Sequence, residues 1–204
     1  WQSTLETVVK NTPNASLDAL IPAVYTGATT ADRLAAYAGD MARKVRISFP
    51  TEVAARMLDR QQLAVSGATA APAATFLRAA AQLGYSLGRT PLNAFLAESS
   101  AQLPAIDSDT LATVKTLHRM YQVTTSNESY QAALAAGFTS ARQIAAIEKD
   151  DFIAQYGSKF PSAQEAEWVS GRSQTVSSVT FNICSSAMLM DTAPPVYSLS
   201  ASPA

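Results

Sequence analysis

The feature that most constrains the fold of this chain is an apolar period of three to four residues, which returns in one segment after another. In residues 31–49 the side chains that share one helical face are Leu34, Tyr37, Ala38, Met41 and Val45. In residues 107–123 the corresponding set is Leu111, Val114, Leu117, His118 and Tyr121. Few segments show the period of two that is typical of strands. The sequence therefore predicts an all-α fold, in the form of an irregular multi-helix bundle.

Capping residues and proline indicate where these helices begin and end. Ser3 with Glu6 three residues later has the capping-box pattern at the start of the first helix. Pro50 is expected to end the helix over residues 31–49, and Thr51 is expected to be the N-cap of the next helix. Short helices separated by such signals predict a bundle with many corners.

A change of composition suggests an internal boundary. Small residues and proline replace the periodic pattern at residues 66–75, which predicts a hinge. The expected organisation is an N-terminal helical segment over residues 1–65, the hinge, and a helical hairpin with a long helix over residues 76–190. Residues 191–204, with a proline pair, are expected to be an extended tail. Because the chain opens on Trp1 without a leader, we expect it to be a piece of a longer polypeptide.

Residues 162–190 are expected to form one long helix that lies along partner helices. A second capping box, Ser162 with Glu165, opens the segment. Apolar residues then recur seven apart at Val169, Val176, Ile183 and Met190. The seam expected to face partner helices consists of Val169, Val176, Val179 and Ile183. A strand over residues 175–183 stays open as an alternative, since this stretch is rich in β-branched residues.

The charge balance argues against nucleic acid as the main partner. The chain has 15 Lys and Arg residues against 16 Asp and Glu residues, whereas nucleic-acid-binding domains carry an excess of positive charge. A local basic face is nevertheless conceivable across the Pro50 corner, formed by Arg43, Lys44, Arg46, Arg56 and Arg60. Acidic residues are interleaved with these five, so a solvated face or an interface rim is the favoured interpretation.

Residues with the potential for catalysis do not form a recognisable motif. His118, the only histidine, has the spacing of an apolar helix face, so we expect a partly buried structural role. Cys184 beside an isoleucine is expected to be a small core residue. Glu148, Asp150 and Asp151 are expected to lie at the start of a helix, where they complement the helix dipole. We therefore expect no enzyme activity, no cofactor and no metal. The sequence contains no run of about 18 apolar residues, so it predicts no membrane span.

The segment AALAAGFTSARQIAAIEKDDFIAQYG, residues 132–157, predicts a compact hairpin of three short helices. Gly137 is expected to adopt positive φ, Phe138 to insert between helices, and Thr139 or Ser140 to cap the next helix. The alternative is a helix-hairpin-helix module, whose glycine-rich turn presents amides to phosphates. This turn has one glycine and one arginine and is followed by acidic residues, so docking against other helices is the favoured interpretation.

With the flanking sequence, this hairpin resembles a known family. Residues 117–157, followed by AQEAEWVSGRSQ, are similar to a segment near the N-terminus of the A component of Tc (toxin complex) insecticidal toxins, also called virulence plasmid A proteins. The positions that match the family pattern are Leu134, Gly137, Phe138, Ile144, Phe152 and Trp168. The APPVYSLSASP stretch after Met190 resembles the loop that follows in the family. The resemblance covers roughly residues 31–197 and is strongest over residues 111–190.

The resemblance implies a piece of the α-helical shell of a large, secreted, self-assembling and pore-forming translocation device, without catalysis of its own. Its implied partners are the rest of the parent polypeptide, other copies of the toxin subunit and other toxin-complex components. The pore helices, linker and receptor-binding insertions of such a protein are not in this sequence. A nucleic-acid-binding hairpin and a cryptic enzyme remain alternatives. A basic strip continuous with the Gly137 turn would favour the first, and a pocket that joins His118 to a carboxylate would favour the second.

Overall fold

The computed structural model of the chain describes residues 2–11 and 16–192, and all regular structure in these residues is helical. The predicted all-α fold is therefore confirmed. The helices are α1 (Gln2–Asn11), α2 (Leu17–Leu20), α3 (Thr30–Ser48), α4 (Pro50–Asp59), α5 (Gly67–Gln82), α6 (Leu92–Ser99), α7 (Ser108–Val123), α8 (Asn127–Ala135), α9 (Ala141–Ala145), α10 (Lys149–Tyr156) and α11 (Ala163–Thr192), with short 3-10 turns η1 (Ser100–Gln102) and η2 (Gly157–Lys159).

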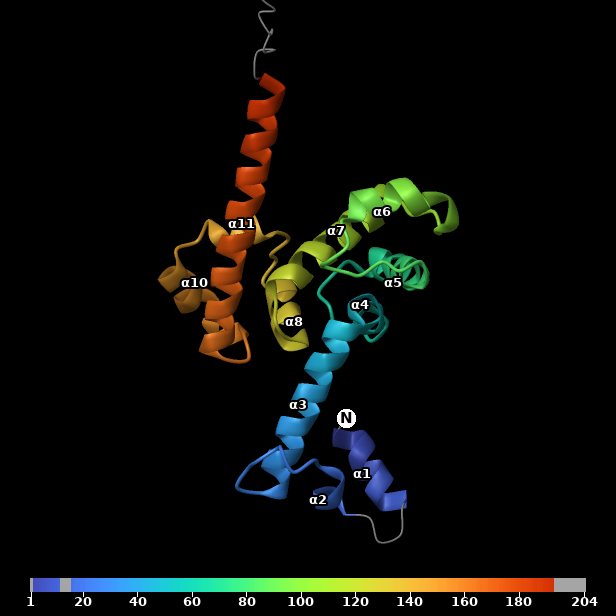
Figure 1. Cartoon of the computed structure of the whole chain (residues 1–204), viewed down its shortest axis with the longest axis vertical. Helices are drawn as coiled ribbons and strands as arrows, with labels where there is room; N and C mark the ends of the chain where they lie inside the picture. The colour runs from blue at the N-terminus through green and yellow to red at the C-terminus, as the bar shows by residue number, and fades with distance from the viewer. Residues whose placement is uncertain (1, 12–15, 193–204) are drawn as a thin grey trace, which may run out of the picture.

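The helices form a central body from which two long helices extend in opposite directions (Figure 1). Helix α3 connects the body to α1 and α2 at one end of the molecule, and α11 runs beyond the body at the other end. Within the body α4 packs on α5, α5 packs on α7, and α11 packs on α9 and α10. None of the described helices is both long and apolar enough to cross a lipid bilayer.

The corner between α3 and α4 follows from Pro50, as the sequence predicts. Phe49 ends α3 and is also the residue before α4, with φ −131° and ψ 56°. The expectation that Thr51 is an N-cap is wrong, because Thr51 lies inside α4. Its buried hydroxyl donates to the carbonyl oxygen of Tyr85 at 2.7 Å and accepts from the N–H of Leu87 at 2.9 Å. Thr51 thus links α4 to the loop that follows α5.

The expected hinge at residues 66–75 is helical, and this prediction is wrong. Ser66 precedes α5, which continues without interruption through Pro72 to residue 82. Proline removes one helical hydrogen bond, which disfavours a helix interior. Here the cost is offset by packing: the buried residues of α5 include Ala73, Phe76 and Leu77, on the helix that lies against α4. The small residues that suggested a flexible linker in fact permit close helix contact.

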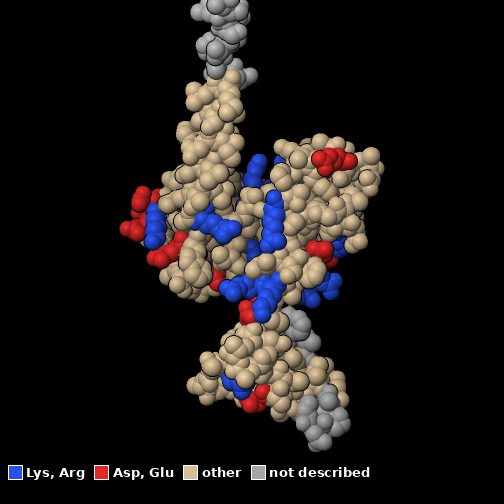
Figure 2. Space-filling model, viewed as in Figure 1, with Lys and Arg blue, Asp and Glu red and all other residues tan. Residues whose placement is uncertain are grey.

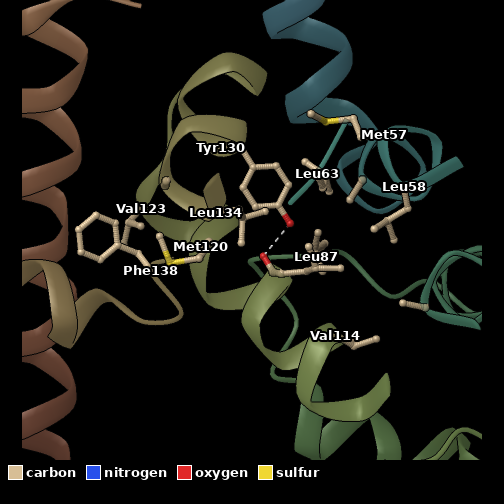
Figure 3. Packing of buried hydrophobic residues seen from close by; sticks show 14 of the residues in the cluster. Met57, Leu58, Leu63, Leu87, Val114, Met120, Val123, Tyr130, Leu134 and Phe138 are labelled. Carbon is tan, nitrogen blue, oxygen red and sulfur yellow. Dashed lines mark hydrogen bonds between the residues drawn. The ribbon is translucent and has the colours of Figure 1, made fainter. Parts of the chain in front are cut away.

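The core of the body lies where α4, α5, α7 and α8 meet. Tyr130 of α8 is fully buried there, and its hydroxyl donates to the carbonyl oxygen of Leu117 in α7 at 3.1 Å (Figure 3). The apolar side chains of this core come from these four helices and from the segments that follow α4, α5 and α8; among them are Met57, Leu58, Leu63, Phe76, Leu87, Val114, Met120, Val123, Leu134 and Phe138. One continuous core therefore joins the N-terminal half of the body to the hairpin.

Helix α11 is a single element of 30 residues, so the strand alternative for residues 175–183 is wrong. Its buried face is Ala166, Val169, Ser170 and Ser173, at the spacing of one helix face, with Val176 partly buried against the core. The expected extended tail, which includes the APPVYSLSASP stretch, lies outside the described residues apart from positions 191 and 192. The Ser3 side chain of the first expected capping box also lies outside them.

Candidate functional site

The Gly-Phe turn between α8 and α9 is built to end one helix and to bury an aromatic ring. Gly137 has φ 84°, which glycine adopts at little steric cost. The N–H of Phe138 donates to Ala133 O at 3.2 Å and the N–H of Gly137 donates to Leu134 O at 3.0 Å. This pair of bonds is the Schellman motif of a helix C-terminus. Ser140 is the N-cap of α9 and accepts from the N–H of Gln143.

The Phe138 side chain points into an aromatic cluster. Phe138 is 7% exposed, and its ring centre lies 5.8 Å from that of Phe152 and 4.9 Å from that of Tyr156. Phe152 also lies 5.8 Å from Phe160, measured between ring centres. Leu134 and Ile144 are buried in the same core. The structure thus places all five expected docking residues in or beside one packed hairpin.

The backbone amides of this turn already have acceptors within the chain. Besides the two Schellman bonds, the N–H of Thr139 donates to Oε1 of Gln143 at 2.7 Å. A phosphate-binding hairpin needs such amides to be free for the ligand. Arg119 and Arg142 do lie near α9, where they line a hollow together with Phe181 of α11. The N–H groups of Gly137, Phe138 and Thr139, however, already donate hydrogen bonds within the chain.

The expected seam of α11 is only half covered. Val169 is fully buried and Val176 is partly buried, but Val179 is 52% exposed and Ile183 is 65% exposed. The prediction that all four face partner helices is therefore wrong for the last two within this chain. Phe181 is 71% exposed on the same part of the helix. The cause is length, because α11 extends beyond the helices that could cover it (Figure 1).

The five residues expected to form a basic face do not act as one surface. Arg46 is 4% exposed, so its assignment to a solvated face is wrong. Its Nη2 donates to the Thr124 carbonyl oxygen at 3.1 Å and to Thr124 Oγ1 at 2.8 Å, and its Nη1 donates to Asn127 Oδ1 at 2.9 Å. Burial lowers the pKa of Arg46. Lys44 forms an ion pair with Asp40 at 2.9 Å. Arg56 of α4 and Arg60, the residue after α4, are exposed.

Arg43 and Arg46 instead line a cleft together with Arg89 and Arg172, which the sequence did not indicate as site residues. The cleft has a volume of about 690 Å³. Its charged and aromatic lining residues are Arg43, Arg46, Arg89, Arg172, Glu128, Glu165, Tyr121 and Trp168, and we call it the arginine cleft. Figure 2 shows Lys and Arg side chains gathered on the middle of the molecule, near the end of α3 that enters the body. Four arginines thus share a cleft with two glutamates.

Glu165 is held at one side of the cleft by hydroxyl groups. Ser126 Oγ donates to Glu165 Oε2 at 2.6 Å, and Ser129 Oγ donates to the same oxygen. The N–H of Glu165 is capped by Ser162 Oγ at 3.1 Å, which is half of the predicted capping box. The Glu165 side chain reaches α8 instead of completing the box. This contact connects the start of α11 to the start of α8.

His118 lies in a neutral, hydrogen-bonded position. The N–H of Gly88 donates to His118 Nδ1 at 3.2 Å, so Nδ1 acts as an acceptor. The Tyr85 hydroxyl lies 2.7 Å from the same Nδ1. Burial lowers the pKa of His118, with a smaller contribution from Arg119. Nε2 lies 3.3 Å from the side-chain amide of Gln122. None of these described contacts is a carboxylate.

The remaining candidate residues for chemistry do not converge on one site. Cys184 is exposed on α11, so the expectation that it packs in the core is wrong. Glu148 precedes α10, and Asp150 and Asp151 lie in its first turn, as expected for dipole complementation. Among the residues that the structure describes, no group of three or more His, Cys, Asp or Glu side chains is arranged to hold a metal ion.

Comparison with known proteins adds no relative: no protein-family model, curated protein or solved structure matches this chain.

Proposed function

We propose that this chain is a non-enzymatic assembly segment of the α-helical shell of a large, secreted, Tc-toxin-like A component. The observation that carries the proposal is the uncovered apolar part of α11. Residues 173–190 contain no Asp, Glu, Lys or Arg, and Val179, Phe181 and Ile183 are exposed there. A helix of mixed propensity gains most of its stability from packing, so such a surface favours contact with further helices.

The hairpin supports the same proposal, since its features serve packing. Phe138 is buried among aromatic rings, and the amides of the Gly137 turn are bonded within the chain. His118 contacts a tyrosine, a glycine and a glutamine, which is the pattern of a structural histidine. The implied partners are the remaining helices of the parent polypeptide and other copies of the toxin subunit.

The association surface is tested by light scattering coupled to size-exclusion chromatography over a range of protein concentrations. We expect the wild-type chain to self-associate as concentration rises. Val179→Asp combined with Ile183→Asp should keep the chain monomeric without loss of helicity, because both side chains are exposed. Gln174→Asp, also at an exposed position of α11, is the control and should associate like the wild type. A wild-type chain that stays monomeric and binds no apolar dye would contradict the proposal.

The toxin assignment is tested separately, by sequencing the coding region around this segment. We expect a long open reading frame that encodes pore-forming helices after this region. A reading frame without such helices would refute the assignment to a Tc-like toxin and would leave the association surface to be judged by the scattering experiment.

A further inference from the structure

We propose that the arginine cleft is a binding site for a small organic polyanion, a molecule with two or more phosphate or carboxylate groups. This inference goes beyond the assembly role and does not depend on it. The arginines of the cleft come together from distant parts of the chain. Arg43 and Arg46 come from α3, Arg89 from the loop between α5 and α6, and Arg172 from α11. Like charges brought together from distant segments repel one another, and an anion between them removes this cost.

The cleft keeps an excess of positive charge. Its lining carries four arginines against Glu128 and Glu165, and of the four arginines Arg43 pairs with Asp40 at 3.7 Å. Neither Arg46, Arg89 nor Arg172 forms an ion pair with any carboxylate among the described side chains. A buried guanidinium without a counter-ion is costly, and buried charges are normally paired. Glu128 and Glu165 favour the charged form of Arg46, but neither forms an ion pair with it, so a bound anion would add negative charge beside Arg46.

Some hydrogen-bond donors of the cleft arginines remain available to a ligand. The three hydrogen bonds of Arg46 to Thr124 and Asn127 fix its guanidinium, so this residue contributes a positive charge at a fixed position. Arg172 is anchored differently, through Nε, which donates to the carbonyl oxygen of Gln122 at 2.5 Å. Its two terminal nitrogens can then bind an anion in the forked geometry that phosphate and carboxylate groups accept. Arg89 is exposed and can turn toward the same ligand.

The size and the walls of the cleft determine the class of ligand. A volume of about 690 Å³ is much larger than a single inorganic ion needs and lies within the range of roughly 300–1,000 Å³ that is usual for small-molecule sites. Trp168 lines the cleft and is 52% exposed. Its ring can cover the non-ionic part of a ligand, and it can report binding through its fluorescence.

The experiment uses Trp168 as the only tryptophan, in a Trp1→Phe background, since these are the two tryptophans of the chain. Pyrophosphate and citrate are titrated separately, with sodium chloride at matched ionic strength as the screening control. We expect a saturable change in fluorescence with at least one of the two polyanions. Saturation with pyrophosphate alone assigns a phosphate ligand, and saturation with citrate alone assigns a carboxylate ligand. Saturation with both supports a general polyanion site.

Two variants decide whether the response comes from the cleft. Arg89→Gln combined with Arg172→Gln should weaken binding at least tenfold, while Arg60→Gln, an exposed arginine outside the cleft, should leave the Kd unchanged. Arg46 is left in place because it is part of the buried structure, and circular dichroism checks that each variant is folded. A response that sodium chloride reproduces, that does not saturate, or that survives the double substitution would overturn the proposal.

Discussion

The guanidinium carbon of Arg46 lies 3.8 Å from the centre of the Tyr121 ring, and the Tyr121 hydroxyl donates back to the carbonyl oxygen of Arg46 at 2.9 Å. These two residues are 75 positions apart in the sequence, so the pair connects α3 to α7. A cation over an aromatic ring is stabilised most where water is excluded. The buried ring also has a raised phenol pKa, to about 12, because burial disfavours its charged form. The pair therefore holds a cation against a neutral ring.

The first prediction is that Arg46 and Tyr121 are energetically coupled. A double-mutant cycle with Arg46→Met and Tyr121→Leu, measured by denaturant unfolding, should give a coupling free energy of about 1–2 kcal/mol. Arg43→Met on the same helix is the control and should leave stability unchanged within error, because the Arg43 side chain is 70% exposed. Additive effects of the two substitutions would show that the contact between guanidinium and ring contributes nothing.

A second prediction concerns the aromatic cluster of the hairpin. Phe138→Ala should reduce the free energy of unfolding by about 3–5 kcal/mol, the usual cost of emptying a buried aromatic site. Phe181→Ala is the matched control, because Phe181 is 71% exposed and its loss leaves no cavity. A change of under about 1 kcal/mol for Phe138→Ala would mean that the ring is not part of the stabilising core.

Most helices could be predicted from the sequence, because the residue patterns that define them depend on near neighbours in the chain. The periods of α3 and α7 and the glycine at the end of α8 depend on neighbours within a few residues. The expected hinge failed for a related reason. Small residues and Pro72 are weak helix signals, and the helix at residues 67–82 is specified by its packing on α4, which lies earlier in the chain.

The candidate site was not predictable in the same way, because it depends on contacts across the chain. Arg46 appears in the sequence among other charged residues, and its burial follows from Thr124 and Asn127, which lie 78 and 81 positions away. Arg89 and Arg172 reach the arginine cleft from two further segments. In a single sequence no spacing rule brings these residues together. The sequence did indicate Arg43 and Arg46 as part of a basic face, and Glu165 as part of a local cap, but it gave no sign of the contact between Glu165 and α8.

A third prediction follows from the lowered pKa of His118. The folded chain binds the His118 proton less readily than the unfolded chain, in which the pKa is near its ordinary value of 6.5. The contribution of His118 to the free energy of unfolding should therefore be fully present above the unfolded pKa. It should decrease as the pH drops below that pKa, since the unfolded state takes up the proton first. His118→Asn preserves an acceptor near the Nδ1 position. It should flatten the difference in unfolding free energy between about pH 8 and about pH 5.

His118 is the only histidine, so this variant isolates the effect. A wild-type chain whose stability is constant over that range, or a variant with the same pH profile as the wild type, would show that His118 is not held neutral by the fold.

The last prediction distinguishes the two halves of α11 by amide hydrogen exchange in dilute, monomeric protein. The first half is anchored, because Ala166, Val169, Ser170 and Ser173 are buried against the body. The second half, beyond Val176, has exposed apolar side chains and β-branched residues of modest helix propensity. Local opening costs little where few apolar contacts are lost. Amides of residues 180–190 should therefore exchange at least about tenfold faster than those of residues 166–176.

Concentration provides the control for that measurement, because association should cover the second half of α11 and slow its exchange selectively. The first half is already buried within the body, so its exchange should not depend on concentration. In the variant with Val179→Asp and Ile183→Asp, the second half should stay in fast exchange at every concentration, since charged side chains resist burial without a partner. Equal protection of both halves in the dilute wild-type chain would show that α11 is stable without further contacts, which would remove the physical reason for an association surface there.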